Sequence, residues 1–136
     1  ISYDLSFEID LDATTTRCAQ LLLRANGDLG LLIECDIENA ELRLRRDTAD
    51  GWSAGASRSP LNLTGKSRLD FRICVGVCSV ELFVDGGKIV HSINDFAPLE
   101  NNGIRFQVDD GQLVIEKLVG YPLKAVTDPA LTFELH

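Results

Sequence analysis

The 136-residue chain has no methionine, one tryptophan and two histidines, and its apolar residues never form a long unbroken run. The lack of any stretch near 20 apolar residues argues against a membrane-spanning helix. Thirteen basic residues stand against 21 acidic ones, so the net charge is −8. Because an acidic surface repels phosphate backbones and anionic bilayers, we expect neither nucleic acid nor a membrane as partner.

The length predicts one domain with a single core. The apolar fraction of 45% and the charged fraction of 25% are typical of a soluble globular protein. The first residues, ISYDLSFEID, begin inside an alternating pattern and show neither a methionine nor a positively charged leader. We therefore expect a part of a larger protein, cytoplasmic or secreted as that protein is.

Four cysteines leave two interpretations open: Cys18, Cys35, Cys74 and Cys78. They could form two disulfides in an oxidising compartment, but a core of this size does not need them, so we favour free thiols. The spacing of Cys74 and Cys78 differs from that of most zinc knuckles, and the only histidines are His91 and His136. We expect no metal site and no cofactor.

Apolar and polar residues alternate along most of the chain, as in half-buried strands. Leu5, Phe7 and Ile9 face one way in YDLSFEIDLD, and similar runs bring the expected number of strands to about nine. Turn signals such as Asn26-Gly27 and Asp85-Gly86-Gly87 separate them. The pattern predicts an all-β fold, a two-sheet antiparallel β-sandwich of the concanavalin-like jelly-roll type.

The segment GWSAG, residues 51–55, matches the G-x-S-x-G pattern of a serine nucleophile. That motif needs a buried strand before Ser53 and a helix after it, whereas RRDTAD is polar and ASRSPLNLTG contains Pro60 and Gly65. Nothing in the sequence brings His91 to Ser53. We predict instead a solvated loop over 47–65.

Paired acids are candidate glycosidase groups, because such enzymes use two carboxylates. The pairs are Asp10 with Asp12, Glu34 with Asp36, and Asp109 with Asp110. Each pair is most simply a set of solvated charges on a sheet face or at a turn. We therefore predict no catalytic residue in this chain.

The stretch SRLDFRICVGVCSVELFVDGGKIVHSINDFAP, residues 67–98, resembles the C-terminal β-sandwich of glycoside hydrolase family 32. Members of that family usually show Val-Glu-Val-Phe-Val-Asn-Asp-Gly where this chain has Val80 to Gly87. The segments GLLIECDIENAELRLRRD and NNGIRFQVDDGQLVIEKLVGYPL also resemble the family. One departure is Gly76-Val77 in place of the usual Asp-Arg. The likeness predicts a module over 1–123 and an extension over 124–136.

The resemblance implies that catalysis belongs to an N-terminal five-bladed propeller with three acidic motifs, none of which occurs here. The family comprises invertases, levanases, inulinases and sucrose-6-phosphate hydrolases. We expect a non-catalytic accessory module of a fructan- or sucrose-hydrolysing enzyme, which stabilises the propeller and aids homodimerisation. If Val80, Leu82 and Val84 face the core, Glu81 and Phe83 face outward and are candidates for the domain interface.

The alternative is a self-standing, lectin-like module that binds carbohydrate such as fructan or sucrose. Aromatic rings would stack on sugar, and the candidates are Trp52, Tyr3 and Tyr121. A third hypothesis, an extracellular adhesive domain, would be favoured by disulfides.

Overall fold

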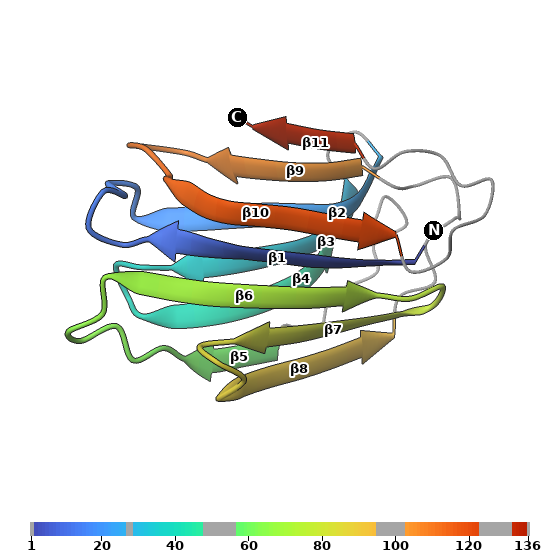
Figure 1. The fold of residues 1–136 in the computed structure, drawn as a ribbon, viewed down its shortest axis with the longest axis horizontal. Helices are drawn as coiled ribbons and strands as arrows, with labels where there is room; N and C mark the ends of the chain where they lie inside the picture. The colour runs from blue at the N-terminus through green and yellow to red at the C-terminus, as the bar shows by residue number, and fades with distance from the viewer. Residues whose placement is uncertain (1, 27–28, 48–56, 95–102, 123–131, 136) are drawn as a thin grey trace.

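The structure is a computed structural model that describes residues 2–26, 29–47, 57–94, 103–122 and 132–135. Its described elements are all strands: β1 Tyr3–Asp10, β2 Cys18–Asn26, β3 Leu29–Asp36, β4 Glu41–Asp47, β5 Ser57–Pro60, β6 Arg68–Val75, β7 Ser79–Val84, β8 Ile89–Asn94, β9 Gly103–Val108, β10 Ile115–Pro122 and β11 Thr132–Leu135. One sheet has the order β10-β1-β6-β7-β8 and the other β11-β9-β2-β3-β4-β5. The two sheets pack face to face, which confirms the predicted all-β sandwich (Figure 1).

The core lies between the sheets, where the alternation of the sequence directs apolar side chains. In β1, Leu5, Phe7 and Ile9 are buried, as predicted, while the residues between them are only partly covered. Phe7 stacks on Phe71 of its own sheet at 4.8 Å and meets Phe106 of the opposite sheet edge-on at 5.1 Å. The contact between Phe7 and Phe106 ties the two sheets together.

The predicted turn at Asp85-Gly86-Gly87 joins β7 to β8, and all three residues have positive φ angles of 58°, 65° and 83°. Glycine adopts such angles without steric cost, which explains its place in the turn. The tight connection brings β8 beside β7 at the edge of the five-stranded sheet.

Two strands were not predicted. The expected loop over 47–65 contains β5, whose sequence SRSP pairs with β4 along one side only. Proline and short polar residues are compatible with an edge strand, which leaves one row of backbone groups unpaired. The other strand, β11, lies in the segment 124–136 and pairs in parallel with β9.

The turn after β6, where this chain has Gly76-Val77, is held by an arginine from the opposite sheet. Arg24 of β2 donates to the carbonyl oxygen of Val77 at 3.0 Å and also to that of Gly76. Only 5% of Arg24 is exposed. One end of the sandwich is therefore linked by side-chain to backbone hydrogen bonds.

Candidate functional site

The candidate sugar-binding aromatics lie in very different environments. Tyr3 is fully buried in the core, so a sugar cannot reach its ring in this structure. Tyr121 on β10 is 63% exposed and its ring is available to a ligand. Trp52 lies outside the described residues.

The candidate interface residues face away from the core, as the alternation predicts. Val80, Leu82 and Val84 are fully buried, Glu81 is exposed and Phe83 is half-buried. Phe83 pairs across the sheet with Val90 of β8, which is 53% exposed. The outer face of the five-stranded sheet thus carries a small apolar area at β7 and β8.

His91 contacts the hydroxyl of Ser59 in the described part of the chain. Ser53, the serine of the G-x-S-x-G pattern, lies outside the described residues. The Oγ of Ser59 lies 2.7 Å from the Nε2 of His91. Among the described residues, no acid forms a hydrogen bond or ion pair with His91, and Ser59 lies on a strand rather than on a strained turn. The contact is a bridge between the edges of the two sheets.

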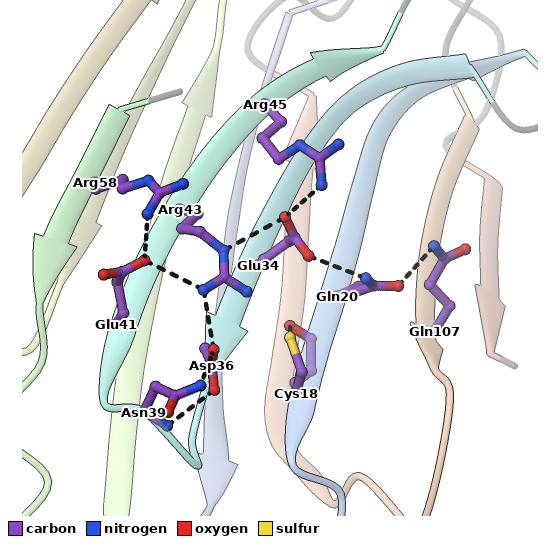
Figure 2. Close-up of polar contacts among 11 residues, drawn as sticks. Cys18, Gln20, Glu34, Asp36, Asn39, Glu41, Arg43, Arg45, Arg58 and Gln107 are labelled. Atoms are coloured by element: carbon purple, nitrogen blue, oxygen red, sulfur yellow. Dashed lines mark hydrogen bonds and ion pairs between the residues drawn. The ribbon is translucent and has the colours of Figure 1, made fainter. Parts of the chain in front are cut away.

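The most connected polar site lies on the outer face of the six-stranded sheet. Strand pairing aligns one side chain from each of five neighbouring strands in a cross-strand row: Gln107 (β9), Gln20 (β2), Glu34 (β3), Arg43 (β4) and Arg58 (β5). Figure 2 shows that these side chains point to the same side of the sheet and approach one another.

Hydrogen bonds run along this row. The Nε2 of Gln107 donates to the Oε1 of Gln20 at 2.9 Å, and the Nε2 of Gln20 donates to the Oε2 of Glu34 at 3.2 Å. The other oxygen of Glu34 accepts from the Nη1 of Arg45 at 3.2 Å and lies 3.7 Å from the Nε of Arg43. The orientation of each group is therefore fixed by its neighbours (Figure 2).

A second branch starts at Arg43. Its Nη1 donates to Asp36 at 2.9 Å and to Glu41 at 3.2 Å, and Glu41 lies 3.6 Å from the Nη1 of Arg58. Asn39 donates to Asp36 through both its backbone and its side-chain nitrogen. We call the nine connected residues the polar network: Gln20, Glu34, Asp36, Asn39, Glu41, Arg43, Arg45, Arg58 and Gln107.

The acids at the centre of the network are not solvated, which corrects the expectation from the sequence. Glu34 and Asp36 are each only 6% exposed. Burial acts to raise the pKa of Asp36, but hydrogen bonds from Asn39 and Arg43 outweigh it, and the pKa is lowered overall. Asp36 therefore stays ionised at neutral pH, and its partners are the reason that it can be buried.

The other acid pairs also have structural partners. Asp10 is 9% exposed, and its Oδ1 accepts from the backbone nitrogens of Asp12 and Ala13 at 3.1 Å each, which stabilises the turn after β1. Asp110 accepts from Arg17, and this contact lowers the pKa of the Asp110 carboxyl. Both carboxylates thus stabilise local structure. Asp10 was expected to be solvated, and its burial corrects that expectation.

The carboxyl of Asp36 and the thiol of Cys18 lack the properties of catalytic groups. A glycosidase needs one carboxyl with a raised pKa as general acid, and the pKa of Asp36 moves the other way. The nearby thiol of Cys18 is no nucleophile at neutral pH, because burial and then the charges of Glu34 and Asp36 raise its pKa to about 11. What remains is a fixed array of hydrogen-bond donors and acceptors.

The network could have been found from the spacing of charges in two predicted strands. Glu34 and Asp36 alternate with apolar residues in β3, and Arg43 and Arg45 do the same in β4. A hairpin with the turn at Glu38-Asn39 places these opposite charges on one face. Gln20 and Gln107 carry no charge that would mark them as members of the network. Only the order of the strands in the sheet places these two side chains beside Glu34.

Three further features of the described residues bear on the expectations from the sequence. No three His, Cys, Asp or Glu side chains there are grouped so that they could hold a metal ion. None of those residues forms a helix long and apolar enough to cross a membrane. All four cysteines are free, in agreement with the interpretation favoured from the sequence.

The fold is shared with parts of two enzymes and with whole small proteins. The exo-inulinase of Aspergillus awamori matches 88% of this chain with a TM-score of 0.72 and 17% identity. The sucrose-6-phosphate hydrolase of Lactobacillus gasseri matches 84% with a TM-score of 0.64 and 22% identity. Sheep galectin-11 matches 89% with a TM-score of 0.64 and 12% identity, and 90% of the galectin is covered.

The share of the matched protein that is covered is small for the two enzymes and large for the galectin. This chain spans 24% of the exo-inulinase and 24% of the sucrose-6-phosphate hydrolase. The family described as "Glycosyl hydrolases family 32 C terminal" matches residues 1–122, which is nearly all of the predicted module over 1–123. The chain therefore belongs to the glycosyl hydrolase family 32 C-terminal domain family.

Proposed function

We propose that this chain is the non-catalytic β-sandwich module of a fructan- or sucrose-cleaving glycosidase and that it stabilises an N-terminal propeller domain. The observation that carries the proposal is the family match over residues 1–122, combined with a chain that spans about a quarter of two related enzymes. Asp10 and Asp110 are engaged at turns and Asp36 in the polar network, which supports a role other than catalysis for these acids.

The outer face of the five-stranded sheet is our candidate for the contact with the propeller. Strand pairing places Val119, Ser6, Arg72, Phe83 and Val90 in one row across that face. The apolar members at β7 and β8 would lose contact with water on docking, which is favourable. Interfaces between domains of one chain commonly bury several hundred square ångströms on each side, and a face of this kind is wide enough.

The first test is the coding sequence upstream of Ile1. We expect it to encode a propeller that carries the three acidic motifs of the family. The propeller and this chain, produced separately and mixed, should form a complex that elutes earlier on gel filtration than either part. The same experiment on this chain alone tests the predicted homodimer. An upstream sequence that encodes no propeller would remove the basis of the proposal.

A pair of variants locates the contact. Phe83→Glu places a charge on the proposed interface and should weaken the complex at least about tenfold, because a buried unpaired charge is costly. Arg45→Gln alters the opposite sheet and should leave the affinity for the propeller unchanged. Equal affinities for Phe83→Glu and the unaltered chain would exclude this face.

A further inference from the structure

The polar network is an unusual way to cover the outer face of a sheet. Removing charges from water costs several kcal/mol per ion, and replacing buried ion pairs by apolar residues is often neutral or stabilising. The next cross-strand row on the same face includes Leu22 and Leu32, which are only 3% and 8% exposed. Apolar side chains are thus accommodated there, so folding alone does not explain two buried carboxylates with ordered partners.

The network has a buried centre and exposed flanks. The side chain of Glu34 at the centre is only 8% exposed. The side chains of Arg45 and Arg58 at the flanks are 44% and 65% exposed, so their guanidinium groups can be reached from solvent. The row crosses five adjacent strands, which corresponds to about 19 Å. That length fits an extended ligand of several units rather than a single small molecule.

The charges of the network exclude one large class of ligand. Glu34, Asp36 and Glu41 are balanced by Arg43, Arg45 and Arg58, and every one of these groups is paired. A site for phosphate or another anion would need surplus positive charge. This face instead offers alternating donors and acceptors with no net charge, beside the amide groups of Gln20 and Gln107.

Sugar hydroxyls match such an array, because each hydroxyl donates one hydrogen bond and accepts others. Neighbouring hydroxyls on one ring can accept from an arginine and donate to a carboxylate at the same time. The groups are already oriented, so binding would not require them to be ordered first, and this lowers the entropic cost of binding.

We propose that the outer face of the six-stranded sheet binds a neutral oligosaccharide along the polar network, with Arg45, Arg58, Glu41 and the two glutamines as contacts. This site differs from the aromatic candidates Trp52, Tyr3 and Tyr121. The inference goes beyond the accessory role and does not depend on it, because the propeller contact is placed on the opposite sheet.

The experiment is an NMR titration of the full ¹⁵N-labelled chain with inulin-derived, cellulose-derived and galactan-derived oligosaccharides of about four units. A heparin-derived oligosaccharide of similar length serves as the anionic probe. We expect saturable shifts of backbone amides in β2, β3 and β4 with at least one neutral probe at low millimolar concentration. The heparin probe should cause no comparable shifts.

Variants then connect binding to the network. Arg45→Gln and Gln20→Ala should each raise the dissociation constant, the first by about tenfold, since a charge-assisted hydrogen bond is lost. The matched control is Arg72→Gln, which breaks the exposed pair with Asp4 on the other sheet and should leave binding unchanged. Unfolding temperatures of all variants establish that the fold is retained.

Three results would overturn the inference. The first is the absence of amide shifts on these strands with every neutral probe. The second is binding that Arg72→Gln weakens as much as Arg45→Gln does. The third is a loss of propeller binding in Arg45→Gln without any saccharide binding, which would identify the face as a domain interface. None of these results would remove the family assignment or the accessory role.

Discussion

Ser59 and His91 join the two sheets at one edge of the sandwich, with 2.7 Å between the Oγ and the Nε2. Ser59 belongs to β5 and His91 to β8, which are the last strands of their sheets on that side (Figure 1). The two strands are not hydrogen-bonded through their backbones, so this side-chain contact links elements that the sheet ladders leave separate.

The His91 contact predicts a dependence of stability on pH. Burial lowers the pKa of His91 below its usual value near 6.5. Between about pH 7 and pH 5 the unfolded chain therefore binds more protons than the folded one, and the free energy of unfolding falls as the pH falls. Between pH 7.5 and 5.5, the free energy of unfolding measured in urea should fall less for His91→Gln than for the unaltered chain. Equal falls in the two proteins would contradict this role.

Substitution of Arg43 should lower the free energy of unfolding more than substitution of most other residues of the polar network. Arg43→Leu leaves the buried Asp36 without its counter-charge and removes one of the two arginines beside Glu34, and we expect a loss of about 3 kcal/mol in the free energy of unfolding. Arg72→Leu removes an exposed partner of Asp4 and should cost no more than about 1 kcal/mol. Urea unfolding of both variants measures the difference, and similar losses would show that the network is not desolvated in solution.

Truncation of two neighbouring residues of β7 should destabilise the chain to different degrees. Leu82→Ala removes a fully buried side chain and should destabilise the chain by about 2–5 kcal/mol. Phe83→Ala removes a larger but half-buried side chain on the outer face, so its effect on the isolated chain should be clearly smaller. Thermal unfolding compares the two. A greater loss for Phe83→Ala would mean that the faces of β7 are assigned the wrong way round.

Position 111 requires a glycine for two reasons, the backbone conformation and the close approach of neighbouring atoms. Its φ is 63°, and a Cβ there would lie 2.8 Å from the carbonyl carbon of Thr15. Gly111→Ala should therefore destabilise the chain by more than the roughly 1 kcal/mol of left-handed backbone strain alone. Gly86→Ala is the control, because Gly86 has a similar φ of 65° with open space around it. Chemical denaturation of the two variants would reject the steric account if they were equally stable.

Much of the fold could be predicted from the local sequence. A side-chain period of two is a property of each strand by itself, so Leu5, Phe7 and Ile9 identify their face without knowledge of any partner. The same holds for Glu81 and Phe83 on β7. The short strands β5 and β11 escaped prediction because SRSP has no alternation and TFEL alternates over only 4 residues, and they are strands only through pairing with β4 and β9.

The candidate site was predicted much less well. Glu34 and Asp36 were expected to be solvated, since a polar residue on one side of a strand usually faces water. Their burial results from the register of β3 with β4, which sets Arg43 opposite Glu34, and from the position of β2, which supplies Gln20. The opposite charges of Glu34 and Arg43 could have been matched through the hairpin turn at Glu38-Asn39, but Gln20 is uncharged and carries no pattern that would mark it as a partner of Glu34.

The sequence by itself determined that this chain forms a β-sandwich, since alternation and turn residues act over a few positions at a time, and its motifs carried the resemblance to the family 32 C-terminal domain. Only the tertiary structure decided that Tyr3 is buried, that His91 meets Ser59 and that nine polar residues form one network. The physical reason is that burial and hydrogen-bond partners depend on which strands become neighbours, and hydrogen bonding between distant segments makes that choice.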